Sequence, residues 1–229
     1  MKRGVGHRVA RAVVGLTSGA VAIALVVHAA PVVRAEYGRL AVADLETAVR
    51  EQQKLSSGQL ETLASVLKDS YAHRGAPATI QDLALVQMLL REQTGAESPG
   101  LDKIAARLGE GLSARPAAPH AWARLARVQF EQDRDGSVVR DSLILAITTG
   151  PTVRRLSVPR LEIGLRLWDR LDAYERGLVR RQARLAFRHD AEATVRVALA
   201  AGNVSVVRSE LSSLSAQARF DALVANREG

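Results

Sequence analysis

The chain has 229 residues, of which 47% are apolar but only 3% are aromatic, and it contains no cysteine. The absence of thiols excludes a disulfide framework, thiolate catalysis and cysteine metal sites. A core with so few aromatic side chains must be built from Leu, Val and Ala, and this composition favours closely packed helices over a sheet.

The net charge of +8 is unevenly distributed along the chain. Residues 1–39 carry six basic side chains and one acid, whereas the remaining residues carry 26 basic and 23 acidic side chains. Most of the excess therefore lies beside the apolar N-terminal segment, where it indicates membrane topology. We expect no nucleic-acid partner, because no aromatic side chains alternate with the arginines of the body for base stacking.

Residues 12–33 form an uncharged run of 22 residues with three polar side chains. As a helix this run would be about 33 Å long, enough to cross a hydrocarbon core of about 30 Å. The positive-inside rule predicts a cytoplasmic basic tail over residues 1–11 and a body on the other side of the membrane. The tail contains no acid and four basic residues, namely Lys2, Arg3, Arg8 and Arg11.

Two interpretations of the apolar run share this orientation. In the first, residues 12–33 remain as a transmembrane helix in the inner membrane of a bacterial envelope, and the body is periplasmic. In the second, they belong to a signal peptide that is cleaved after Ala35, with Val33 and Ala35 at the −3 and −1 positions. Arg34 is unfavourable between these two positions, so the anchor is the preferred interpretation. A mature N-terminus at Glu36 would exclude it.

The body shows helical periodicity throughout, and no stretch alternates like a strand between hairpin turns. We therefore predict an all-α fold, with a helical region over residues 36–113 and a tetratricopeptide-like region over residues 114–229. Thr79 is the expected N-cap of the third helix, because Asp82 follows it three residues later. The expected helices are 36–55, 56–74, 79–95, 101–112, 119–132, 138–149, 157–171, 173–188, 191–200 and 204–224.

Residues 119–151 are similar to one tetratricopeptide unit, a pair of antiparallel helices. The similarity is carried by Trp122, Leu125, Ala126 and Phe130, followed by Ala146 and Pro151. In such a unit, a small residue such as Ala126 lets the two helices approach, and Pro151 ends the second helix. A single unit buries its apolar face only against neighbours, so the flanking helices must supply them.

Three stretches, RPAAPHAWARLARVQF, SLILAITTGP and VPRLEIGLRLWDRL, extend this similarity over residues 115–190. In them the chain resembles single-pass, tetratricopeptide-like proteins of GC-rich Gram-negative bacteria that are encoded among surface-polysaccharide synthesis and export genes. The resemblance implies an array of antiparallel helix pairs and an accessory or scaffolding role in the cell envelope. It includes no catalytic motif, so it implies no active-site residue.

One stretch of the body is strongly basic. Residues 154–188 contain ten basic and four acidic side chains, and four of the arginines recur every four residues, which places them on one helical face. These candidate partner-binding residues are Arg176, Arg180, Arg184 and Arg188. The face would suit an acidic polysaccharide, lipid headgroups or an acidic protein partner. Alternatively, it is a solvated face whose arginine stems cover apolar surface.

The two tryptophans, Trp122 and Trp168, each lie in an apolar helical stripe, so we predict core positions for them rather than a carbohydrate platform. The five histidines show no ligand or triad spacing, and no phosphate-binding loop occurs. The sequence therefore predicts a protein without catalytic residues, metal or cofactor.

We interpret the chain as a membrane-anchored helical interaction protein that is accessory to surface-polysaccharide assembly or export and binds protein partners of the envelope. One alternative is an assembly factor for another envelope system, such as cytochrome maturation or secretion. A less favoured alternative is a glycan-acting enzyme with an acid pair in the helical body.

Overall fold

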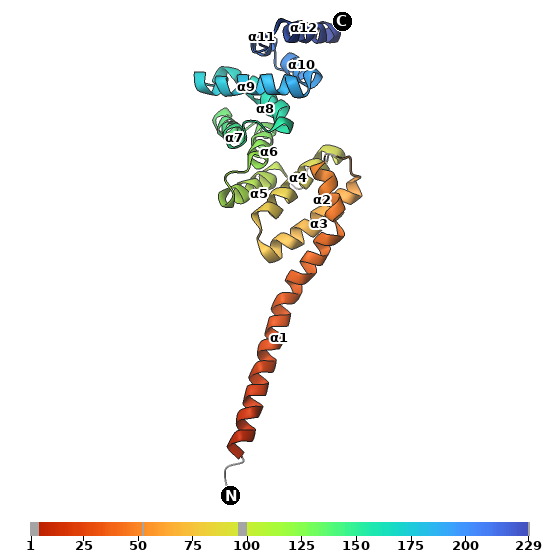
Figure 1. Cartoon of the computed structure of the whole chain (residues 1–229), viewed down its shortest axis with the longest axis vertical. Coiled ribbons are helices and arrows are strands. Elements are labelled where there is room, and N and C mark those ends of the chain that lie inside the picture. The colour runs from red at the N-terminus through yellow and green to blue at the C-terminus, as the bar shows by residue number, and fades with distance from the viewer. Residues whose placement is uncertain (1–4, 52, 96–99, 229) are drawn as a thin grey trace. The chain divides into compact units, whose positions relative to one another are not determined.

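The computed structural model describes residues 5–51, 53–95 and 100–228, and their side chains at 23–49, 51, 53–95 and 100–227. The expected all-α fold is confirmed for these residues, among which there is no strand. The chain divides into two compact units, residues 1–94 and 95–229. Figure 1 shows their helices in chain order, from red to blue.

Unit 1 contains α1 (Val5–Ala41), α2 (Ala43–Arg50), α3 (Ser57–Arg74) and α4 (Pro77–Thr94). The helix α3 packs against both α4 and the end of α1, and Leu60, Leu63 and Leu67 line its buried face. Local signals set its ends. Ser56 caps the N-terminus in a capping box with Gln59, and Gly75 ends the helix in the left-handed conformation, with φ of 59°.

The helix α1 is 37 residues long and is interrupted by no loop, although it contains Pro31. Its described apolar side chains at 23–27 have no covering layer: Ile23, Leu25, Val26 and Val27 are each 65–67% exposed. Residues 12–22 of the apolar run, and the basic tail before them, lie outside the described side chains. Within the part that is described, no helix is long and apolar enough to cross a membrane.

Two expectations for unit 1 are wrong in detail. The expected helix over residues 36–55 is divided, because its first residues continue α1 and the chain bends at Val42, which is buried in the core with Ala48. Thr79 is no N-cap. The helix α4 begins at Pro77, a residue suited to a first turn, and the buried Thr79 hydroxyl instead accepts a hydrogen bond from Arg39 Nη1 at 3.3 Å.

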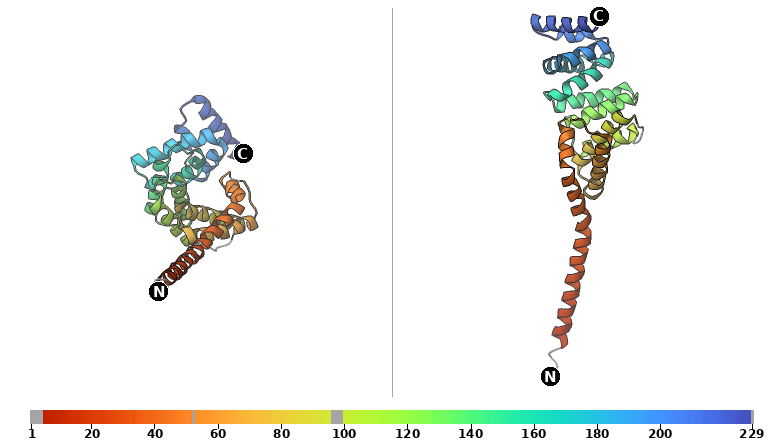
Figure 2. Two further views of the ribbon diagram at one scale, coloured as in Figure 1. Left: turned by 60° about the horizontal axis from the view of Figure 1, so that its bottom comes forward. Right: turned by 90° about the vertical axis from the view of Figure 1, so that its right-hand side faces the viewer.

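Unit 2 is a stack of antiparallel helix pairs, which follow one another in the same order in both side views (Figures 1 and 2). Its α-helices are α5 (Leu101–Ala114), α6 (Pro119–Glu131), α7 (Gly136–Thr149), α8 (Ser157–Arg166), α9 (Ala173–His189), α10 (Ala191–Ala200), α11 (Val204–Ser209) and α12 (Leu214–Glu228). Two short 3-10 helices, η1 (Arg154–Leu156) and η2 (Trp168–Arg170), flank α8. The boundary placed at 113/114 from the sequence falls at the end of α5, which packs on α6.

Alternate helices of unit 2 also contact one another. The helices α6, α8, α10 and α12 touch in succession and form a first row, while α7, α9 and α11 form a second row. The two rows enclose a continuous core that contains Ala126, Leu143, Leu161 and Phe220, all of them fully buried. The small residue Ala126 thus lies in the core, as the repeat pattern predicts.

Two expected helices in unit 2 are interrupted. The helix predicted over residues 157–171 ends at Arg166 and continues as η2, and the helix predicted over residues 204–224 is split into α11 and α12. The second break allows Leu211 to turn into the core. It also allows the Ser213 hydroxyl to accept a hydrogen bond from the Ala216 amide at 3.1 Å, at the start of α12.

Candidate functional site

The four candidate arginines lie on α9, whose orientation is set by its caps and its apolar face. Asp172 and Glu175 form a capping box at its N-terminus, with hydrogen bonds of 2.8 and 2.9 Å to the backbone amides. Leu178, Val179, Ala183, Ala186 and Phe187 turn into the core of unit 2. The arginines occupy another face of the helix, as their spacing predicts.

The N-terminal half of this face surrounds Trp168. The guanidinium groups of Arg176 and Arg180 each lie 5.6 Å from the centroid of the Trp168 ring, and Arg176 Nε donates a hydrogen bond of 3.1 Å to the Trp168 carbonyl. Trp168 is half-buried and packs against the core, so the predicted packing role fits its position. Its ring also holds two of the candidate arginines in place by cation–π contacts.

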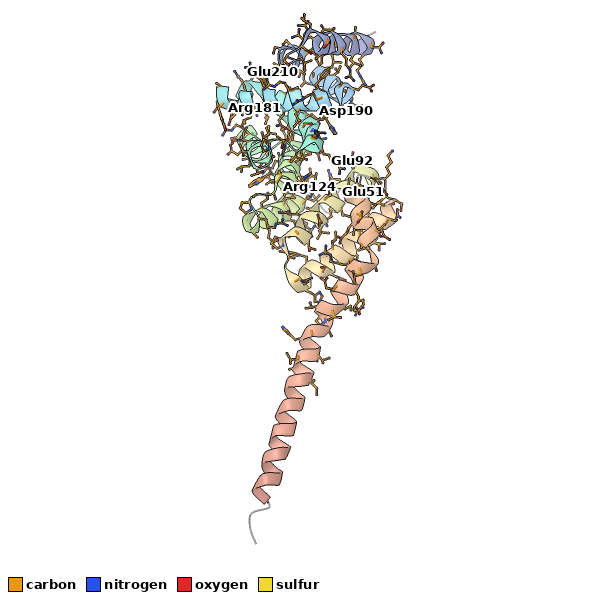
Figure 3. The ribbon with its side chains drawn as sticks, viewed as in Figure 1. Glu51, Glu92, Arg124, Arg181, Asp190 and Glu210 are labelled. Carbon is orange, nitrogen blue, oxygen red and sulfur yellow. The ribbon has the colours of Figure 1, made fainter. Side chains whose placement is uncertain are left out.

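The C-terminal half of this face meets Glu210, which follows α11 and is labelled in Figure 3. Arg180 Nε lies 3.4 Å from one carboxylate oxygen of Glu210, and Arg184 Nη1 donates a hydrogen bond to the other. The Glu210 side chain is only 14% exposed, whereas those of Arg180 and Arg184 remain 49% and 44% exposed. Glu210 therefore fixes the two arginines and leaves part of each guanidinium facing outward.

The structure thus brings three of the four candidates into contact with groups of unit 2. The fourth, Arg188, is exposed at the end of α9. These contacts are made by the guanidinium groups and pre-order their outward donors. Binding of an acidic partner by Arg176, Arg180, Arg184 and Arg188 remains a prediction.

A second charged network, which the sequence did not reveal, lies on the first row of helices. Arg127 of α6 pairs with Glu131 at 2.6 Å, on its own helix, and with Glu162 of α8 at 2.9 Å. Arg166 of α8 lies 5.8 Å from the centroid of the Phe130 ring of α6. The Arg127–Glu131 spacing was readable in the sequence, but the pairing across 35 residues depends on the contact between α6 and α8.

Arg160, within the basic stretch, is not a surface residue. It is 1% exposed, and burial lowers the pKa of its guanidinium to about 10, so the group still carries its charge at neutral pH. Arg160 Nη1 donates a hydrogen bond of 2.8 Å to the Gly150 carbonyl, and Nη2 donates to the Ala146 carbonyl. A cation at this position satisfies carbonyls at the C-terminal end of α7 and interacts favourably with the helix dipole.

Unit 1 has a small cavity that includes two acids, Glu46 and Asp82, among its lining residues. The other lining residues are Val49, Leu63, Leu67, Leu85 and Val86. The cavity volume is ≈ 10 Å³, room for about one water molecule. Glu46 binds Arg39 through two hydrogen bonds of 3.1 Å.

No cluster of three or more potential metal-ligating side chains occurs among the described residues. Comparison of the chain with protein-family models and with curated proteins finds no significant match.

Proposed function

We propose that the chain is a single-pass inner-membrane protein whose helical body lies on the periplasmic side and acts as a non-enzymatic interaction module. The observation that carries this proposal is the pairing of two features in one chain. An uncovered apolar segment at 23–27 lies within a long N-terminal helix, and a stack of antiparallel helix pairs follows it.

Retention of the apolar segment is favoured by the packing around the alternative cleavage site. The helix α1 continues through Ala35 and Glu36 without a break. Ala35 is buried, Glu36 pairs with Arg74 of α3, and a Cβ atom on Gly38 would lie 3.6 Å from Val66 of α3. Cleavage after Ala35 would cut a helix that contributes to the core of unit 1.

The interaction role is supported by the two-row packing of unit 2. Stacked helix pairs of the tetratricopeptide kind bind partner segments on side chains presented by successive helices. Here the first row presents the Arg127–Glu162 network and the second row presents the arginine face of α9. The resemblance over residues 115–190 leads us to assign the partners to surface-polysaccharide assembly or export.

The proposal is tested in two steps on the full-length protein. First, the protein is extracted from membranes and its N-terminus is sequenced, where a start at Glu36 would exclude the anchor. Second, partners are identified by crosslinking in intact cells followed by purification. Recovery of envelope polysaccharide machinery is expected. An uncrosslinked protein, together with unchanged surface polysaccharide after deletion of the gene, would contradict the interaction role.

A further inference from the structure

We propose that the α3–α4 turn, residues 71–77, lies in the headgroup layer of the membrane, so that unit 1 contacts the lipid surface directly. This inference rests on the proposed anchoring by α1 and adds a second membrane contact. The partner is the phospholipid headgroup layer on the side of the body.

The turn lies beside the part of α1 that immediately follows the apolar run. The last turns of α1 pack along α3, with Gly38 next to Val66 in the middle of α3 and Glu36 paired with Arg74 at its end. Since the later α3 residue pairs with the earlier α1 residue, the two helices run in opposite directions. The end of α3 therefore points back toward the apolar run, as Figure 1 shows.

The distance along α1 places the Glu36–Arg74 ion pair, at the start of this turn, at headgroup depth. Glu36 is three residues beyond Val33, the last residue of the apolar run, which corresponds to about 4.5 Å along a helix. The headgroup layer on each side of a bilayer is about 5–8 Å thick. If Val33 lies at the edge of the hydrocarbon, side chains level with Glu36 fall within this layer.

The side chains at this end of unit 1 suit a lipid interface. Tyr37, which is 70% exposed, and the half-buried Tyr71 are two of the three tyrosines in the chain, and tyrosine is enriched at membrane interfaces. Arg34 and Lys68 are exposed and can place their cationic ends among lipid phosphates. Small residues occupy the turn itself and allow its backbone to approach the surface: Ala72, Gly75 and Ala76.

The absence of native cysteine permits a clean labelling experiment on the full chain. Three single-cysteine variants, Val26→Cys, Ala72→Cys and Ser57→Cys, change residues that are exposed on the protein. Ser57 is the matched control because it lies at the other end of α3, about 22 Å from Ala72 along the helix. Each variant is labelled with the same fluorophore and reconstituted into phosphatidylethanolamine–phosphatidylglycerol vesicles, after circular dichroism has verified wild-type helicity.

Quenching by lipids that carry a nitroxide on the headgroup or on the acyl chain then reports depth. We expect the Val26 label to be quenched by the acyl-chain nitroxide, the Ala72 label several-fold more by the headgroup nitroxide than the Ser57 label, and the Ser57 label hardly at all. Equal, weak headgroup quenching at positions 72 and 57, with position 26 quenched by the acyl chain, would overturn this inference and leave the anchor intact. A Val26 label that no lipid nitroxide quenches would overturn both the headgroup contact of the turn and the proposed membrane anchor.

Discussion

Gly164 of α8 lies directly against Val179 of α9. A Cβ atom on Gly164 would be 2.7 Å from Val179 Cγ2 and 2.8 Å from Val179 Cγ1, and Val179 is fully buried. The two helices therefore pack with no room for a methyl group. Ala126 of α6 is another small residue that is fully buried in this core.

We expect Gly164→Ala to destabilise the protein, because overpacking a rigid core costs about 1–3 kcal/mol. Gly177→Ala is the matched control, since the new methyl group would meet nothing within 4 Å and replaces glycine within the same helical pair. Alanine is favoured over glycine in a helix by up to about 1 kcal/mol, so the control should gain stability. Urea unfolding, monitored by circular dichroism, measures the free energy of unfolding of both variants. Equal stability of the two variants would contradict the close packing.

Arg160 provides a second test of the packing of unit 2. Arg160→Met removes the donors to the Ala146 and Gly150 carbonyls but keeps an unbranched apolar stem, and we expect it to lower the free energy of unfolding by about 2–4 kcal/mol. Arg160→Lys should lower the free energy of unfolding by less, because lysine keeps the positive charge and lacks only the planar, forked donors of the guanidinium. Arg188→Met, at an exposed position, should change stability by less than about 0.5 kcal/mol. An Arg160→Met variant as stable as the wild type would show that the hydrogen bonds of the guanidinium do not stabilise the protein.

The arginine face of α9 is tested with a polyanionic polysaccharide. If the face binds acidic partners, Arg188→Glu should weaken binding of alginate several-fold, and the affinity should fall with rising salt. Glu210→Gln should not weaken binding, since it removes a negative charge beside Arg180 and Arg184. Isothermal titration of the full-length protein in detergent measures these affinities. Binding that is indifferent to Arg188→Glu would leave this face with a structural role only.

The environment of His120 leads us to expect that the free energy of unfolding depends on pH. Partial burial lowers the pKa of His120, and the positive charges of Arg124, Arg160 and Arg155 lower it further. The unfolded chain, with a histidine pKa of about 6.5, therefore binds a proton more readily than the folded chain. The contribution of His120 to the free energy of unfolding should fall as the pH drops below about 6.5 toward the folded pKa.

Proton NMR of the His120 ring should give a titration midpoint below 6.5. The stability difference between the wild type and His120→Gln should shift in favour of the variant between pH 7.5 and pH 5. A midpoint above 6.5 would contradict the predicted influence of the three arginines.

The helices with strong local signals were predicted well. The caps Ser56 and Asp172 and the first-turn position of Pro119 are local features, and α3, α6 and α9 begin within one residue of the starts expected from the sequence. Helices whose ends depend on distant contacts were predicted less well. The break at Val42 and the split between α11 and α12 occur because Val42 and Leu211 turn into cores that other helices form.

The candidate site was predicted in part. Spacing alone placed Arg176, Arg180, Arg184 and Arg188 on one helical face, since residues four apart are neighbours on a helix. Spacing could not reveal that Trp168 and Glu210 hold three of these arginines, because Glu210 is 26 residues from Arg184 in the sequence. The same limit applies to Arg160, which the sequence grouped with surface arginines.

The sequence by itself determined the helical class, the concentration of positive charge before an apolar run, and the absence of cysteine chemistry. These properties depend on composition and on local periodicity, which act within a few turns of a helix. Only the tertiary structure decided which charges are already paired, which glycine permits two helices to touch, and which turn of unit 1 lies beside the end of the apolar run. Those relationships join residues that lie far apart in the sequence, and the packing of apolar helix faces brings them together.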